Sequence, residues 1–588
     1  MSSAAIKHCV PCFLQIYCLK GALTSMKPPW SCNVAPKIQG RILLLTICAA
    51  GIGGTFQFGY NLSIINAPTS HIQEFTNETW QARTGEPLPD YLILLMWSLI
   101  VSLYPLGGLF GALLAGPLAI TLGSLSVSLP PRKKSLLVNN IFVVLAAILF
   151  GFSRKAGSFE MIMLGRLLVG VSAGVSMNIQ PMYLGESAPK ELRGAVAMSS
   201  AIFTALGIVM GQVVGLRELL GDPQAWPLLL ASCLVPGVLQ LASLPLLPES
   251  PRYLLIDCGD TEACLAALRR LRGSGDLARE LEELEEERAA CQGCRARRPW
   301  ELFQHRALRR QVTSLVVLGS AMELCGNDLM YAYASSVFQK AGVPEAKVQY
   351  ATIGTGSCEL LMAIVSLSQE TPSHCLPHTS GTMAGCMGLR FLPLKCVAVE
   401  RMGRRVLLIG GYSLMACWGS IFTVALCLQV AGVDEGWRVQ ARLTSTSPLP
   451  RPRQSSFPWT LYLAVACIFA SILSFGIGPA GVTGILATEL FDQMARPAAC
   501  MVCGALMWIM LFLVSLGFPF IMEALSHFLY VPFLGVCVCG AIYTGLFLPE
   551  TKGKTLQEIS EELHRLNFPR RAQGPMWRSP EVIQSTEL

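Results

Sequence analysis

The chain has 588 residues, of which 52% are hydrophobic and only 14% are charged, with a net charge of +7. A soluble protein needs about a quarter of its residues charged to cover its surface, so this composition excludes a string of soluble domains. The high apolar content equally excludes a disordered chain. What remains is a protein that crosses the membrane many times, with lipid covering its apolar surface.

Twelve stretches are almost free of Asp, Glu, Lys and Arg, and each is long enough to cross the bilayer as a helix of about 20 residues. They are too long and too uniformly apolar for the strands of a membrane β-barrel. We therefore predict an all-α membrane protein with twelve transmembrane helices in two six-helix halves, separated by a charged helical loop. The predicted spans are 42–73, 91–131, 135–153, 167–185, 194–216, 223–248, 311–339, 348–369, 406–433, 454–488, 497–522 and 524–549.

Basic residues set the predicted orientation. They gather in the N-terminal tail, in the central loop, which holds twelve arginines, and in the C-terminal tail. The positive-inside rule places all three in the cytosol, and the N-terminal segment is expected to be a cytosolic tail rather than a signal peptide. Because topology accounts for the basic charge, no nucleic-acid partner is expected. The predicted parts are a tail (1–40), a first half (41–248), the cytosolic loop (249–310), a second half (311–548) and a tail (549–588).

The first loop on the predicted outer side carries mainly acidic charge and the N-glycosylation sequon Asn77-Glu78-Thr79. Its position agrees with the charge pattern, so we predict a glycan on Asn77. A second sequon, Asn61-Leu62-Ser63, lies inside the first span and should be unmodified.

Signs of an enzyme are missing from the sequence, which has neither a phosphate-binding glycine loop nor a catalytic triad. Neither an enzyme nor an ATP-driven pump is expected, and no cofactor is implied. The 22 cysteines have no regular spacing, and most should be small apolar fillers. Cys291-x-x-Cys294 has no second pair at zinc spacing, so no metal site is predicted.

The two halves carry matching charged motifs at corresponding helices, which indicates an internal duplication. Parallel six-helix repeats around a site at the membrane midplane are a transporter design. The matching motifs are Glu186 to Arg193 with Glu489 to Arg496, Pro248-Glu249-Ser250 with Pro549-Glu550-Thr551, and Arg132-Lys133-Lys134 with Gly403-Arg404-Arg405.

These charges lie at the predicted inner helix ends. Carboxylates and guanidiniums there could pair across the two halves and hold the inner side shut while the outer side is open. The alternative is that they only anchor helix ends at the membrane surface. The predicted inner gate consists of Arg132, Arg166, Glu186, Arg193, Glu249, Arg404, Arg405, Glu489, Arg496 and Glu550.

Only the seventh and eighth predicted spans carry acids in their interior, namely Glu323, Asp328 and Glu359. A carboxylate inside a membrane span is costly and normally faces a cavity or a partner. We therefore place these acids near the path of a substrate. The alternative is that they pair with each other, or with Asn327 and Tyr331, as structural polar contacts.

Six motifs along the chain form a set that is typical of one protein family. They are Gly59-Tyr60-Asn61, Gly165-Arg166, Pro181 to Gly194, Pro248 to Tyr253, Glu400 to Arg405 and Pro549 to Gly553. Together these motifs resemble the sugar porters of the major facilitator superfamily and, within them, the facilitative hexose transporters of class II, near the fructose transporter. The resemblance covers about residues 38–568.

The resemblance implies which residues contact the sugar. Phe58, Gln212 and Trp508 fit the family. Elsewhere the chain departs from it, because acids or small residues stand where many members have amides or larger side chains. These departures suit a broader or fructose-accepting pocket. The departing positions are Ala205, Met322, Glu323, Asp328, Glu359, Gly476 and Gly484.

Asn61 bears on the transport mechanism. Similar proton-coupled porters carry an aspartate at this position, and an asparagine cannot take up and release a proton. The resemblance therefore implies passive transport of fructose, glucose or both across the plasma membrane by alternating access. Two alternatives stay open, because Glu323 or Glu359 could titrate in a proton-coupled symporter, or the chain could be a transport-inactive sugar sensor or scaffold. The oligomeric state also stays open.

Three stretches interrupt the resemblance, at 124–131, 368–395 and 430–454. They are rich in Ser, Pro, Thr, His or Arg and show no helical period. We hypothesise that they are retained non-coding sequence or mark an unusual splice form.

Overall fold

The computed structural model of the protein describes most of the chain outside the two tails. The described residues are 41–120, 132–189, 192–272, 277–291, 299–304, 308–370, 403–443, 458–480, 482, 483, 486, 490, 491, 495–551, 554, 558, 559 and 561–563. Over this part every element of secondary structure is a helix, because apolar spans in lipid must satisfy their backbone polar groups within each segment. The predicted all-α architecture is confirmed.

The first half contains six spans, one of which is broken near its start and one near its middle. A further helix, α4 (Thr69–Thr84), lies between the first two spans. The six spans are α2 (Arg41–Gly53) with α3 (Thr55–Ser63) and η1 (Ile64–Asn66), α5 (Asp90–Ile120), α6 (Arg132–Ala156), α7 (Phe159–Ser187), α8 (Arg193–Val214), and α9 (Trp226–Ala231) with α10 (Leu234–Ser243) and η3 (Leu244–Leu246).

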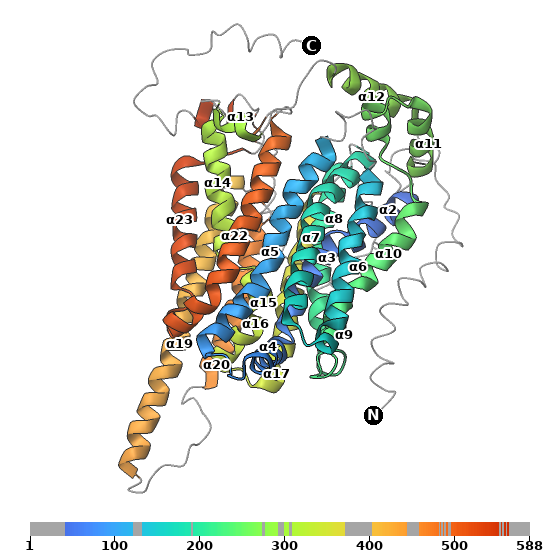
Figure 1. Ribbon diagram of the computed structural model, residues 1–588. Helices are drawn as coiled ribbons and strands as arrows, with labels where there is room; N and C mark the ends of the chain where they lie inside the picture. The colour runs from blue at the N-terminus through green and yellow to red at the C-terminus, as the bar shows by residue number, and fades with distance from the viewer. Residues whose placement is uncertain are drawn as a thin grey trace, which may run out of the picture.

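The charged loop forms short helices that gather at one end of the bundle, at the top of Figure 1. Following the predicted topology, we call this the inner end and the opposite one the outer end. Leu255, Cys264 and Leu268 form a small apolar core between these helices. The loop helices are η4 (Tyr253–Asp257), α11 (Thr261–Arg272), α12 (Leu277–Cys291) and α13 (Pro299–Gln304).

The second half repeats the pattern, and its first span is broken. Gly326, between α14 and α15, has φ of +85°, a backbone conformation that favours glycine, so Asn327 and Asp328 lie at a helix break. The spans are α14 (Arg309–Leu324) with α15 (Leu329–Ala332) and α16 (Ala334–Lys340), α17 (Glu345–Glu370), α19 (Arg404–Leu443), α20 (Pro458–Phe475) with η6 (Gly476–Ala480), α22 (Arg496–Leu525) with η7 (Ser526–Phe528), and α23 (Val531–Phe547).

Nine of these described segments are long and apolar enough to cross a membrane, and two shorter apolar helices, Ser199–Val214 and Val531–Phe547, add to them. The broken α14–α16 segment completes the predicted twelve.

One expectation about the interruptions is wrong. The stretch 430–454 was expected to lack helical structure, but α19 continues through it to Leu443 and has 40 residues. At 1.5 Å per residue it is about 60 Å long, and it projects past the other helices at the outer end (Figure 1). Residues 368–370 belong to α17, whereas 124–131, 371–395 and 444–454 lie outside the described residues.

The two halves lie side by side and share two helix pairs, α5 with α22 and α8 with α17 (Figure 1). The second span of each half thus packs against the fifth span of the other, as a duplicated fold requires. One apolar cluster takes residues from both halves, among them Phe58, Tyr104 and Trp508. Two further clusters near the inner end each belong mainly to one half, around Tyr183 in the first and Tyr412 in the second. The halves therefore share a core toward the outer end and have separate cores at the inner end.

Candidate functional site

Two predicted substrate residues meet where the halves join. The ring centroids of Phe58 on α3 and Trp508 on α22 are 5.5 Å apart with an interplanar angle of 88°. Trp508 is only 1% exposed, and its ring lies against Gly108 of α5, where an added Cβ would overlap it. The close approach of α5 and α22 therefore depends on a glycine, and it brings an aromatic pair together at the centre of the interface.

A second contact between the halves is polar. Gln212 on α8 donates from Nε2 to the hydroxyl of Thr355 on α17 over 3.2 Å, while its buried Oε1 has no hydrogen-bond partner among the described residues. Gly356 leaves room for this side chain, since a Cβ there would lie 2.5 Å from Gln212 Oε1. Ala205, two helical turns before Gln212, is fully buried. The structure thus brings the predicted residue Gln212 to the same interface as the aromatic pair.

Two of the three acids, Asp328 and Glu359, are linked through side chains at the helix break in the second half. Asn327 donates to the hydroxyl of Tyr331 over 3.3 Å and to Asp328 Oδ1 over 3.5 Å. The Tyr331 hydroxyl in turn donates to Glu359, which lies one turn after Thr355 on α17. Asp328 therefore contacts Asn327, and Glu359 contacts Tyr331, as expected if these acids serve as structural polar contacts. Glu359 also lies on the same helix as Thr355, the partner of Gln212.

Glu323 behaves differently from the other two acids. It lies one turn before Asn327 on α14 and is 5% exposed, and its Oε2 has no hydrogen-bond partner among the described residues. A buried carboxylate oxygen without a partner is expensive, so this position is a candidate for binding a hydroxyl group or a proton.

The remaining predicted substrate residues lie at the edge of this arrangement. Met322 is partly buried and packs against the inner apolar cluster of the second half. Gly476 begins η6, but the space expected there is filled, because a Cβ on Gly476 would lie 2.8 Å from Met362 of α17. Gly484 lies outside the described residues.

A separate cavity lies inside the second half, between the α14–α15 break, α19, α20 and α23. Its lining includes Cys325, Asn327, Met415 and Cys537, but none of the ten predicted substrate residues. We therefore place the candidate site at the interface, where polar and aromatic groups from both halves converge.

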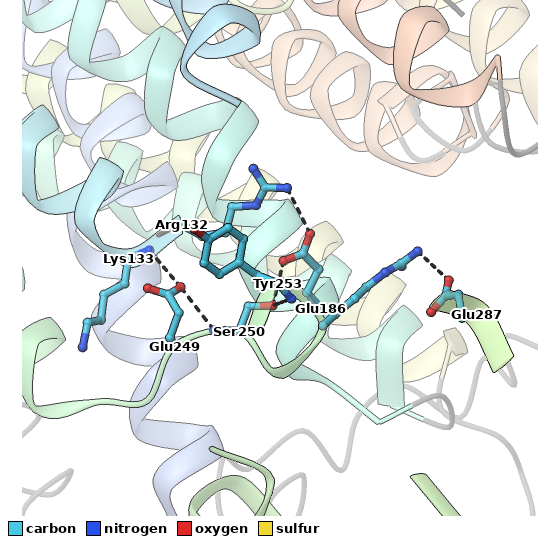
Figure 2. Close-up of polar contacts among 8 residues, drawn as sticks. Arg132, Lys133, Glu186, Glu249, Ser250, Tyr253 and Glu287 are labelled. Carbon is cyan, nitrogen blue, oxygen red and sulfur yellow. Dashed lines mark hydrogen bonds and ion pairs between the residues drawn. The ribbon is translucent and has the colours of Figure 1, made fainter. Parts of the chain in front are cut away.

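The inner ends of α6 and α7 carry the first part of the predicted gate (Figure 2). Arg132 lies 3.6 Å from Glu186 and over the ring of Tyr253, 5.8 Å from its centroid. The hydroxyl of Ser250 donates to Glu186 over 2.7 Å. These contacts join α6, α7 and the start of the cytosolic loop, and none of them reaches the second half.

Glu249 caps the start of α6. Its Oε1 accepts backbone N–H groups from Lys133 over 3.1 Å and from Ser250 over 3.2 Å (Figure 2). Burial raises the pKa of Glu249, while these backbone hydrogen bonds act to lower it. Arg252 extends the network by pairing with Glu287 of α12 at 2.5 Å, which attaches the loop helices to the gate.

Glu550 caps the start of α19 in the second half, as Glu249 caps α6 in the first. Its two carboxylate oxygens accept the backbone N–H groups of Arg404 over 2.8 Å and of Arg405 over 3.2 Å. The Arg405 side chain donates to the backbone carbonyl of Gly545. A carboxylate is favourable at a helix N-terminus, so equivalent motifs of the two halves make equivalent caps. The described gate contacts thus lie within each half, whereas the side chains of Arg193 and Arg496, and the whole of Glu489, lie outside the described residues.

The placement of Arg166 at the inner gate is wrong. Arg166 lies in the second turn of α7, twenty residues before Glu186, which is about 30 Å along the helix. Its guanidinium donates to the backbone carbonyl of Asn61 over 2.8 Å and lies 4.6 Å from the ring centroid of Tyr104. Arg166 therefore belongs to the central interface, near the aromatic pair.

Sequence reasoning missed a set of contacts that closes the outer end, which we call the outer latch. Arg217, after α8, pairs with Glu345 at the start of α17 at 2.5 Å, and Tyr350 donates to Glu218 over 3.1 Å. The signal was present, because opposite charges stand at the outer ends of the fifth and eighth predicted spans. These contacts join one half to the other.

The predicted glycosylation residue lies on α4 at the outer end. Asn77 is partly exposed, and its Oδ1 accepts the backbone N–H of Leu88 over 2.9 Å. Asn61, in the second sequon, is 1% exposed.

Comparisons with known proteins identify the family. The family model described as "Sugar (and other) transporter" matches residues 45–370 and 378–563. The chain is 84% identical over 551 residues to solute carrier family 2, facilitated glucose transporter member 11 of Homo sapiens, covering 94% of this chain and 99% of that protein. It is 38% identical over 532 residues to member 5 of Homo sapiens, covering 90% of this chain and 94% of that protein.

Solved structures share the fold. The partially occluded inward-open conformation of the xylose transporter XylE from E. coli matches with a TM-score of 0.63 and 19% identity, covering 88% of this chain and all of that one. The proton:xylose symporter XylE bound to 6-bromo-6-deoxy-D-glucose matches with a TM-score of 0.61 and 18% identity, covering 89% and 99%.

These findings confirm the resemblance to the facilitative hexose transporters. They also confirm that the chain is a transporter and not an enzyme. The chain therefore belongs to the sugar transporter family, and it is a multi-pass membrane protein with the fold of the major facilitator superfamily, twelve spans in two halves.

Proposed function

We propose that the chain carries hexoses passively, as a uniporter that works by alternating access. The observation that carries the proposal is the environment of Arg166. Its contact on α3 is the backbone carbonyl of Asn61, and no carboxylate lies within ion-pair distance of it in the described part of the chain. The Asn61 amide cannot exchange a proton, so the first half offers no proton carrier beside this buried cation.

The groups at the interface suit a hexose. A sugar needs hydrogen-bond partners for several hydroxyls and an aromatic surface for its apolar face. Gln212, Asp328 and Glu359 supply acceptors, and Phe58 with Trp508 supplies the aromatic surface. Carboxylates accept hydrogen bonds but do not donate them, so exchanging amides for acids changes which hydroxyl arrangements fit. We infer that fructose, alone or with glucose, is the substrate.

The way in which the halves are joined supports alternating access. In this conformation the outer latch and the shared core hold the outer ends together, and each half keeps its own core at the inner end. In the opposite conformation the latch separates and the inner ends approach. The capped and paired charges around Arg132, Glu186, Arg404 and Glu550 would then face one another and serve as the inner gate.

We further propose that the protein works in the plasma membrane with both termini in the cytosol and a glycan on Asn77. A glycan would attach at Nδ2 of Asn77, on the outer end. Asn77→Gln should migrate faster than the wild type in gel electrophoresis because it lacks the glycan, whereas Asn61→Gln should migrate like the wild type. This result would support both the glycan and the orientation. Equal migration of Asn77→Gln and the wild type would contradict them.

A second candidate function is proton-coupled sugar transport. The observation that favours it is Glu323, whose buried Oε2 has no partner among the described residues. A proton could reside there or on Glu359 and move with the sugar.

Uptake of labelled fructose and glucose into proteoliposomes, with and without a pH gradient, separates the candidates. Passive transport predicts equal initial rates under both conditions and no accumulation above the outside concentration. Accumulation driven by an acidic outside would establish the symporter instead. Correctly inserted protein that gives no flux of either sugar would indicate a sensor or scaffold.

A further inference from the structure

Tyr104 of α5 contacts Phe58, Trp508 and Arg166, the aromatic and cationic residues at the interface between the halves. It is fully buried, and its hydroxyl donates to the backbone carbonyl of Phe58 over 3.1 Å. Its ring centroid lies 6.3 Å from that of Phe58, with an interplanar angle of 20°, and 6.2 Å from that of Trp508, with an angle of 79°. One side chain therefore contacts α3 of its own half and α22 of the other half.

Arg166 fixes the ring of Tyr104 from α7. The guanidinium carbon lies 4.6 Å from the ring centroid, within the range of a cation–π contact, which strengthens when both groups are desolvated. Arg166 is itself held by its hydrogen bond to the Asn61 carbonyl and is 2% exposed. The ring is thus held by the Arg166 cation from α7 and by the bond of its own hydroxyl to α3. A ring fixed in this way restricts the position of Trp508, which packs against it.

We propose that Tyr104, anchored by Arg166, is the positioning residue that sets the orientation of Trp508 and Phe58 and thereby the affinity of the site for its sugar. The part of this proposal that concerns sugar affinity rests on the proposed function, because it takes Trp508 as part of a hexose site. Tyr104 acts through Trp508 and Phe58 and need not touch the sugar. Neither Tyr104 nor Arg166 was selected from the sequence for this role. Tyr104 lies in an apolar span without a motif, and Arg166 was assigned to the inner gate.

The positioning itself can be tested without any transport. The full chain is labelled with 5-fluorotryptophan, and the Trp508 signal is assigned in the ¹⁹F NMR spectrum by its disappearance in Trp508→Phe. Tyr104→Leu should shift or broaden that signal, whereas Tyr104→Phe, which keeps the ring on Arg166 and Trp508 and loses only the hydroxyl bond to Phe58, should change it less. Tyr412→Leu removes an equally buried tyrosine from the inner cluster of the second half and should leave it in place. An unmoved Trp508 signal in folded Tyr104→Leu overturns the proposal, whatever the protein transports.

The effect on affinity is tested by hexose uptake into proteoliposomes. Tyr104→Leu should raise KM by up to about tenfold, as expected for the loss of one aromatic contact, with a smaller change in the maximal rate per inserted protein. Because Tyr104 acts through Trp508, combining Tyr104→Leu with Trp508→Leu should raise KM no further than Trp508→Leu alone. Additive effects would overturn the role in affinity. If the wild type carries no hexose, the proposed function fails, and the NMR result alone decides whether Tyr104 positions Trp508.

Discussion

The guanidinium of Arg166 donates a hydrogen bond to the backbone carbonyl of Asn61 over 2.8 Å, and both residues are almost fully buried. The side-chain amide of Asn61 donates instead to the backbone oxygen and Oε1 of Gln57, over 2.8 and 3.0 Å. A carboxylate in place of this amide would stand next to a buried cation. It could take a proton from one side of the membrane and release it on the other, so the proposed passive mechanism depends on the amide at this position.

We expect Asn61→Asp to make hexose uptake depend on the pH gradient, because the new carboxylate must lose its charge or pair with Arg166 during each cycle. The wild type should show the same initial rate with and without the gradient. Asn66→Asp is the matched control, since it adds the same charge on the same segment, where the Oδ1 of residue 66 accepts the N–H of Ser335. If the rate of uptake by Asn61→Asp is the same with and without the pH gradient, residue 61 has no part in deciding the transport mechanism.

Glu359→Gln should change which hexose the site prefers. The substitution keeps an oxygen acceptor for Tyr331 and supplies an amide donor, as the resemblance implies for family members with an amide there. Gain or loss of one hydrogen bond to a sugar hydroxyl is worth about 0.5–1.5 kcal/mol, so the ratio of fructose to glucose KM should change by about two- to tenfold. Competition uptake with both sugars measures the ratio. Glu78→Gln, on the exposed face of α4, is the control, and an unchanged ratio in Glu359→Gln would place this acid outside the site.

Sequence patterns predicted the spans well because lipid excludes charge, so charge-free runs mark helices directly. The interruption at 430–454 was misjudged because its composition is polar, yet α19 continues to Leu443 as a helix that leaves the bundle. Arg166 was misplaced for a topological reason. The fourth span runs from the outer to the inner end, so a residue near its start lies toward the outer end, as the pairing of neighbouring Glu160 with Arg83 of the outer loop shows.

The contacts of the site were harder to predict than its members. Sequence comparison within the family selected Phe58, Gln212 and Trp508, but which side chains meet depends on the rotation of each helix. The approach of Trp508 to Tyr104 follows from packing between segments about 400 residues apart. The separate linkage of Glu359 to Tyr331 joins α17 to the helix break that precedes it. The outer latch was missed because exposed charges at span ends have many possible partners.

Replacing Glu550 should destabilise the inner end of the second half. Its carboxylate caps the start of α19 by accepting the N–H groups of Arg404 and Arg405, and loss of a helix N-cap costs about 0.5–2 kcal/mol. We expect Glu550→Ala to lower the thermal unfolding midpoint in detergent, and Glu550→Gln, which keeps one acceptor oxygen, to lower it less. Glu561→Ala, an acid of the C-terminal segment, provides a comparison. Equal midpoints for Glu550→Ala and the wild type would show that the cap contributes nothing.

Glu249 gives the inner end a defined pH dependence. Burial raises its pKa above the ordinary value, so the folded protein binds this proton more tightly than the unfolded chain does. The stability that this group contributes is therefore fully present below its unfolded pKa and is lost as the pH rises through its folded pKa. We expect Glu249→Gln to gain stability relative to the wild type as the pH rises from about 4 to about 7. A difference in unfolding midpoint that stays constant over this range would contradict the assignment.

Breaking the outer latch should favour the conformation that is open to the outside. Glu345→Lys replaces the pair with Arg217 by a repulsion, so a larger fraction of the protein can bind sugar from the outer side, and the outer KM should fall. The change should be less than about fivefold, because exposed ion pairs contribute little, and it should fade at about 1 M salt, where charges are screened within about 3 Å. Arg217→Glu combined with Glu345→Lys should restore the wild-type KM. Arg83→Glu is the matched control, since Arg83 and Glu160 form an equally short exposed pair within one half, and breaking it should leave the outer KM unchanged. If the double charge exchange fails to restore KM while each single variant lowers it, Arg217 and Glu345 act separately and the latch is not a pair.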